Sequence, residues 1–203
     1  FIVLGSILFG IATPTESAAL GAVGSTLIAL LSKRLDLKIL FEVADNSVRI
    51  TSMVFFILIG ASVFSLVLRG YGGDIMVEEF LSSIPGGPAY SLLIVMLTIF
   101  VLGFFLDFLQ IIFVIVPIVG PSLISMGFDP IWLGILIAIN LQTSFLTPPF
   151  GFALFYFRGI APKEIGTKDI YIGVIPFIIL QVVVLFLIYK FPIVVTYLPS
   201  IIS

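Results

Sequence analysis

The chain has 203 residues, of which 61% are hydrophobic and 10% are charged, whereas an average soluble domain carries roughly 25% charged residues. Its formal net charge is −2, and it contains neither Cys nor His. The composition therefore excludes disulfides, metal sites built on Cys or His, and nucleophiles that depend on a His base. The charge balance also shows no basic patch of the kind that binds nucleic acid.

Long windows without Asp, Glu, Lys or Arg recur along the chain. Each is long enough to cross a hydrocarbon core about 30 Å thick as an α-helix, which takes about 20 apolar residues. Strands of a membrane barrel would instead alternate polar and apolar residues over about 10 positions. We therefore predict an all-α polytopic membrane protein. The uncharged windows are 50–68, 80–106, 108–128, 130–157 and 170–189.

The chain begins inside an apolar run, without an initiator Met or the basic region of a signal peptide. We expect residue 1 to be a cut point inside a longer protein. The first apolar stretch is interrupted by the segment from Gly10 to Ser17, which contains Pro14 and Glu16. Because proline removes an amide donor and clashes with the preceding turn, we predict a first broken transmembrane helix over 1–31.

Lys and Arg in short loops predict which side of the membrane each loop faces. The segment 32–49 is basic and amphipathic, so we predict a cytoplasmic amphipathic segment lying along the interface. A transmembrane helix over 50–68 follows. The connection over 69–87 contains Arg69 among several acids and is predicted to be periplasmic.

Two apolar stretches meet at Leu106-Asp107-Phe108 with no loop between them. Asp107 lies either in a cytoplasmic turn between two full spans or at the buried tip of a re-entrant helical hairpin over 88–127, entered from outside. Non-helical backbone at membrane depth is tolerated only inside protein or beside a water-filled cavity. The residues by themselves leave both arrangements open.

The segment from Asn140 to Gly151 contains Thr147-Pro148-Pro149, with amide and hydroxyl side chains just upstream. One interior proline costs a helix about 3 kcal/mol or more, so the pair predicts a broken transmembrane helix over 128–157 in preference to a mere kink. A basic cytoplasmic loop over 158–169 follows. The last transmembrane helix and a periplasmic C-terminus are predicted over 170–203.

A broken helix leaves carbonyls unpaired on one half and amides unpaired on the other. Carbonyls and hydroxyls suit a small hard cation, while the amide end suits an anion. Many secondary transporters hold substrate and coupling ion at such discontinuous helices. Glu16 and Asp107 are the acids inside the apolar stretches, and each either serves such a site or caps a helix.

Three motifs then resemble the large permease subunit of the tripartite ATP-independent periplasmic (TRAP) transporters, the DctM-like family. They are the segments 10–19, 103–107 and 140–151, and they occur in the family's order. The chain resembles the C-terminal half of that subunit. The sequence from Gln142 to Phe152 resembles that of a branch named for mannitol or chloroaromatic compounds and linked to 2-oxo or 2-hydroxy acids. The resemblance therefore implies a substrate that is a 2-oxo or 2-hydroxy acid or a dicarboxylate.

The resemblance implies one inverted repeat of an elevator-type secondary transporter, whose transport domain carries two re-entrant hairpins. The family couples transport to sodium and uses no other cofactor. It pairs this subunit with a small four-helix membrane subunit and a periplasmic binding protein that delivers an organic acid. The alternatives are a non-transporting scaffold or channel subunit and an intramembrane hydrolase, and the absence of His and Cys argues against the hydrolase.

By the same comparison, the tip over 103–107 and the break over 143–151 would line one sodium site. Ser144 stands where many members of the family have Gly, and Phe108 stands where many have Pro. The candidate sodium ligands are Gly103, Asp107, Thr143, Ser144, Thr147 and Gly151. The candidate substrate-binding residues are Thr13, Thr15, Asn140 and Gln142.

Overall fold

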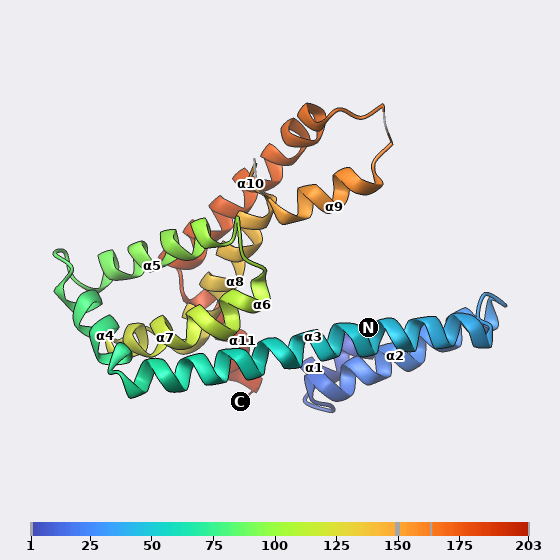
Figure 1. Ribbon diagram of the computed structural model, residues 1–203, viewed down its shortest axis with the longest axis horizontal. Coiled ribbons are helices and arrows are strands. Elements are labelled where there is room, and N and C mark those ends of the chain that lie inside the picture. The colour runs from blue at the N-terminus through green and yellow to red at the C-terminus, as the bar shows by residue number, and fades with distance from the viewer. Residues whose placement is uncertain (1, 149–150, 163, 203) are drawn as a thin grey trace. The chain divides into compact units, whose positions relative to one another are not determined.

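The computed structural model describes residues 2–148, 151–162 and 164–202, and the regular structure in these ranges is helical, which confirms the all-α prediction (Figure 1). The chain forms two compact units: one runs up to Phe55 and includes the residues from Tyr197 onward, and the larger one runs from Phe56 to Thr196. The helices are α1 (Ile2–Leu8), α2 (Pro14–Leu31), α3 (Leu37–Gly70), α4 (Gly73–Ser83), α5 (Pro88–Leu102), α6 (Phe108–Gln110), the π-helix η1 (Ile111–Ile115), α7 (Val116–Ser125), α8 (Pro130–Leu146), α9 (Phe152–Ile160), α10 (Thr167–Lys190) and α11 (Ile193–Ile202).

In the first unit, the interruption predicted within 1–31 lies between α1 and α2, and the chain reverses there. Ser6 and Ser17 share a hydrogen bond of 2.8 Å, and a Cβ on Gly21 would lie 3.1 Å from the side chain of Val3. The two helices therefore pack antiparallel. The N-cap of α2 is Thr13, whose hydroxyl and backbone amide both donate to the Glu16 carboxylate at 2.8 Å.

The helix α3 is continuous over residues that the sequence divides into an interfacial segment over 32–49 and a span over 50–68. Nothing between Leu37 and Ile59 breaks a helix, because this stretch contains neither Pro nor Gly. Its charged residues are spaced as in a helix, and Asp45 bonds Arg49 one turn later at 2.7 Å. Asp36 supports the start of the helix by accepting a hydrogen bond from the amide of Ile39.

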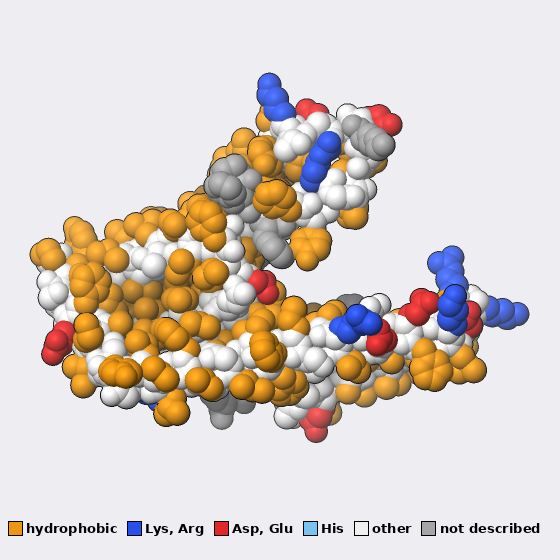
Figure 2. All heavy atoms as spheres, in the orientation of Figure 1, with side chains coloured by type: hydrophobic (Ala, Val, Ile, Leu, Met, Phe, Trp, Pro, Cys, Tyr) orange, Lys and Arg blue, Asp and Glu red, His pale blue; other side chains and the backbone are white. Residues whose placement is uncertain are grey.

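Four helices in the described part of the chain are long and apolar enough to cross a bilayer: α2, α3, the run from Phe108 to Ser125, and α10. The pair α4 and α5 passes the same criterion when taken together and is bent by 119°. Their large apolar side chains are mostly exposed, and Figure 2 shows hydrophobic side chains over most of the visible face. Apolar surface of this extent is typical of membrane contact, so the helices belong to a multi-pass membrane protein.

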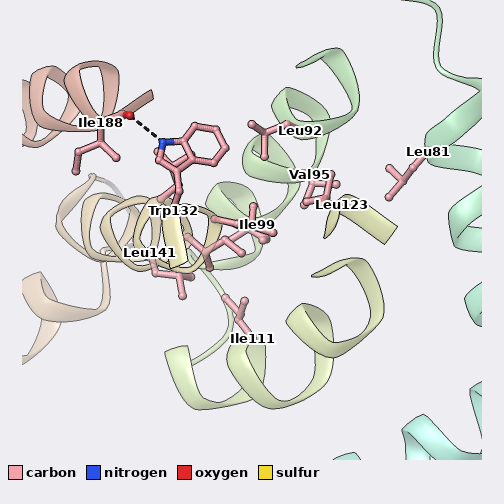
Figure 3. Packing of buried hydrophobic residues seen from close by; sticks show 12 residues of the cluster. Leu81, Leu92, Val95, Ile99, Ile111, Leu123, Trp132, Leu141 and Ile188 are labelled. Carbon is pink, nitrogen blue, oxygen red and sulfur yellow. Dashed lines mark hydrogen bonds between the residues drawn. The ribbon is translucent and has the colours of Figure 1, made fainter. Parts of the chain in front are cut away.

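The larger unit has one main core, formed by α4, α5, the segment from η1 to α7, α8 and α10 (Figure 3). Ile99, Ile111 and Leu123 are fully buried within it. Two buried hydrogen bonds join pairs of helices in this core. The Trp132 indole on α8 donates to the Ile188 carbonyl on α10 at 2.8 Å, and the Ser91 hydroxyl on α5 donates to the Leu81 carbonyl on α4 at 2.7 Å.

Candidate functional site

The candidate site is built where α8 ends. The helix begins at Pro130, with Asp129 as its N-cap accepting from the Trp132 amide at 2.8 Å. It ends at Leu146, and the backbone of its C-cap, Thr147, is extended (φ −85°, ψ 122°). The next residue, Pro148, explains this end, because a proline ring disfavours helical geometry in the residue before it. Pro149 and Phe150 lie outside the described residues.

The end of α8 is rich in oxygen atoms. The Thr147 amide donates to the Ser144 carbonyl at 3.1 Å, and the Thr147 hydroxyl donates to the Thr143 carbonyl at 2.7 Å. Prolines at 148 and 149 supply no amide to the carbonyls one turn earlier. A Cβ on Gly151 would lie 2.5 Å from the Phe145 carbonyl oxygen, so only glycine allows the backbone to pass this closely.

The second part of the site is the turn between α5 and α6, which the family resemblance places at the tip of the 88–127 hairpin. The turn begins at Gly103, whose amide bonds the Ile99 carbonyl at 2.9 Å. Asp107 is the N-cap of α6, and its carboxylate accepts from the Phe108 amide at 2.8 Å. The π-helix η1 follows directly and ends just before Pro117. Such wide turns often mark functional positions in membrane helices.

The turn and the end of α8 touch. A Cβ on Gly103 would lie 2.0 Å from the Ser144 hydroxyl oxygen, and the rings of Phe108 and Phe145 pack edge to face with centroids 6.3 Å apart. We call this contact the tip–break junction and define it by Gly103, Phe108, Ser144 and Phe145. The absence of a side chain on Gly103 is what permits the approach.

Ser144 at this junction is fully buried, with 0% of its surface exposed. Within the described residues its hydroxyl oxygen has no hydrogen-bond partner. A buried polar group without a partner costs about 1–3 kcal/mol, so such a group calls for an explanation. A serine hydroxyl beside helix-end carbonyls can contribute to an all-oxygen shell of the kind that hard cations prefer.

Four of the predicted sodium ligands lie at the tip–break junction or at the ends of the break. Gly103 and Ser144 meet at the junction, Thr147 is the C-cap of α8, and Gly151 is the N-cap of α9. Thr143 is buried, and its hydroxyl donates back to the Ile139 carbonyl at 2.8 Å. Asp107 is half-buried and caps α6.

The predicted substrate-binding residues are divided between the two units. Asn140 is 4% exposed and donates to the Met96 carbonyl on α5 at 2.8 Å. Gln142, two positions later on α8, is exposed. Thr13 and Thr15 belong to the first unit, where Thr13 caps α2 and Thr15 is exposed.

Sequence reasoning did not anticipate that Met96 and Phe145 take part in contacts around the site. Met96 contributes a backbone carbonyl, which any residue would supply, so its identity carries no signal. Phe145 lies inside the motif over 140–151 and pairs with Phe108, the residue after Asp107. The sequence does contain one signal for this pair: an aromatic residue directly follows both Asp107 and Ser144.

These features define a class: a helical membrane protein in which a helical hairpin abuts an interrupted helix. Residues 1–194 match the family described as the DctM component of tripartite ATP-independent periplasmic transporters. The chain belongs to this family, which consists of transporter permeases and not enzymes. With the spans described above, it is a multi-pass protein of the bacterial inner membrane.

Several named relatives are similar to this chain over most of its length. The C4-dicarboxylate TRAP transporter large permease protein of Pseudomonas aeruginosa is 31% identical over 201 residues, which is 98% of this chain and 45% of that protein. The sialic acid TRAP transporter permease protein of Haemophilus influenzae is 29% identical, over 98% of this chain and 32% of that protein. The 2,3-diketo-L-gulonate TRAP transporter large permease protein of Escherichia coli is 26% identical over 88% of this chain and 42% of its own length. The chain thus spans less than half the length of each of these relatives.

Proposed function

We propose that the chain is part of the large permease subunit of a sodium-coupled TRAP transporter that imports an organic acid. One observation carries the proposal. The hydroxyl of Ser144 is buried without a partner in the described residues, at the contact between the Gly103 turn and the interrupted end of α8. A sodium ion held there by the hydroxyl and nearby carbonyls would offset the cost of burying the Ser144 hydroxyl without a partner.

The coupling ion and the substrate play different roles in this proposal. Sodium binds at the tip–break junction, with Thr147 and the Gly151 backbone completing the shell and Asp107 adding negative charge from the hairpin. The long apolar windows that are predicted to cross the membrane contain no Lys or Arg. The positive charge of the bound ion would therefore favour binding of an acid substrate. Coupling would then follow because each ligand stabilises the site for the other.

The substrate class is an organic acid, because named relatives carry C4-dicarboxylate, sialic acid or 2,3-diketo-L-gulonate in their descriptions. Within this class, the motif from Gln142 to Phe145 supports a 2-oxo or 2-hydroxy acid. The order of the three motifs supports the C-terminal half of the subunit. The proposed partners are a small membrane subunit and a periplasmic binding protein. Together with this subunit they would make up the three parts that the family name implies.

The test is uptake by the full-length permease with its small subunit in proteoliposomes, with the binding protein and labelled acid outside. We expect saturable uptake that requires an inward sodium gradient and stops when potassium replaces sodium. Flux that rises linearly with substrate and is unchanged without sodium would instead identify a channel or scaffold subunit.

A further inference from the structure

We propose that Asn140 is a positioning residue: it holds α5 in register against α8 so that the turn at Gly103 reaches Ser144, and it does not bind the substrate. The inference rests on the proposed sodium site, whose geometry it explains. It also replaces the role that the sequence suggested for this residue, because its side-chain hydrogen bond joins two helices and the side chain is buried.

The first observation is the bond itself. The Asn140 side-chain amide donates to the Met96 carbonyl at 2.8 Å, and Asn140 is only 4% exposed. The acceptor lies well inside α5, which runs from Pro88 to Leu102. A hydrogen bond that joins the interiors of two neighbouring helices fixes their positions along each other.

The second observation is that this bond and the tip–break junction lie on one seam. Asn140 and Ser144 are one turn apart on α8 and therefore share a face, as do Met96 and Gly103, which are two turns apart on α5. Both helices run in the same direction along the seam, because Met96 meets Asn140 and the later Gly103 meets the later Ser144.

The third observation is that the rest of the seam is apolar. Leu92, Val95 and Ile99 of α5 are at most 4% exposed, and Figure 3 shows them in the core with Trp132 and Leu141 of α8. Apolar contacts are non-directional and tolerate sliding. A single buried Asn in an apolar helix interface selects one register, as in coiled coils. Asn140 would select the register in which Gly103 faces Ser144.

The experiment uses the full-length permease with its small subunit in detergent, without substrate. The readout is the sodium concentration that gives half of the sodium-induced rise in Tm. Asn140→Leu keeps a side chain of similar size but removes the donor, and we expect it to raise this concentration about fivefold. Should Asn140→Leu fail to fold, Asn140→Ala provides the same comparison.

The matched control is Ser91→Ala. Ser91 also makes a buried hydrogen bond to a carbonyl of another helix, at 2.7 Å, but near the opposite end of α5. We expect Ser91→Ala to lower Tm without changing the half-saturating sodium concentration, which separates positioning of the site from a general loss of stability.

The outcomes separate the two proposals. An unchanged half-saturating sodium concentration in a folded Asn140 variant overturns the positioning role while leaving the sodium site intact. In a second measurement, uptake of the labelled acid by proteoliposomes at saturating sodium, a raised half-saturation for substrate together with a normal sodium titration would make Asn140 a substrate ligand and likewise overturn the positioning role. Absence of any sodium-induced rise in Tm in the wild-type protein contradicts the proposed sodium site, and the positioning role with it.

Discussion

Buried polar side chains in the larger unit differ in how their hydrogen bonds are satisfied. Ser91 and Asn140 donate to carbonyls of neighbouring helices, and these bonds are sufficient reason for their burial. Ser144 has no such partner within the described residues. In a low-dielectric interior an unpaired hydroxyl is costly. Serine therefore supports packing at position 91, whereas at position 144 it is the basis of the proposed sodium site.

Thr147, the C-cap of α8, provides a second test of the proposed oxygen shell. Thr147→Val keeps the shape of the side chain but removes the hydroxyl that now donates to the Thr143 carbonyl. We expect the sodium concentration for half-maximal uptake to rise about fivefold, since one hydroxyl contact contributes about 1 kcal/mol. Thr147→Ser retains the oxygen and should behave like the wild type. If Thr147→Val shows the wild-type sodium response, the break is a hinge and Thr147 is not a ligand.

At the scale of elements, glycine at the hairpin turn sets how closely α5 approaches α8. A Cβ at position 103 would lie 2.0 Å from the Ser144 hydroxyl oxygen and 3.1 Å from its Cβ. Rotating the Ser144 hydroxyl relieves the first contact but not the second. The turn must therefore move away from α8 when any side chain is added.

Gly103→Ala should accordingly reduce both stability and sodium affinity. We expect a loss of about 1–3 kcal/mol in the free energy of unfolding, the usual cost of overpacking, together with a weaker sodium-induced rise in Tm. Gly134→Ala on α8 is the matched control, because a Cβ there meets nothing within 4 Å. A Gly103→Ala protein as stable as the Gly134→Ala protein would contradict the close approach.

Some elements follow from sequence and others do not. The breaks near Pro14 and Pro148 are visible because proline has a local effect on the backbone. The continuity of α3 is not visible, since residues 37–49 favour a helix whether or not it continues into the apolar stretch. The bond from Asn140 to Met96 is not visible either, because it depends on which helix packs against α8. From sequence alone, an Asn in such a motif is equally consistent with a substrate-binding role.

The contact between the tip and the break was suggested by the family resemblance and not by the residues alone. A sequence shows that Gly103 and Ser144 are small, but smallness has many uses in membrane helices. Only the three-dimensional arrangement shows that these two positions face each other and that the hydroxyl between them has no partner among the described residues.

For the whole molecule, the distribution of Lys and Arg predicts the orientation in the membrane. The segment 32–49 should be cytoplasmic and the connection 69–87 periplasmic. Ser32 and Ser82 lie in these two segments and are both exposed. The chain has no Cys, so single Ser→Cys changes give a clean comparison once any cysteines outside these residues are replaced.

We expect an impermeant thiol reagent applied to intact cells to label the Ser82→Cys protein and not the Ser32→Cys protein. Ser32→Cys should become reactive in inside-out vesicles. Labelling of position 32 from outside intact cells would reverse the orientation and, with it, the side from which the hairpin is entered.

The central claim, a sodium site at the tip–break junction, is tested most directly by Ser144→Ala in the full-length permease. Without sodium the variant should be at least as stable as the wild type, because the change removes a buried hydroxyl that has no partner in the part of the chain that the structure describes. With sodium, the rise in Tm seen in the wild type should be lost or should need about tenfold more sodium. A Ser144→Ala protein that sodium stabilises at wild-type concentrations would contradict the account.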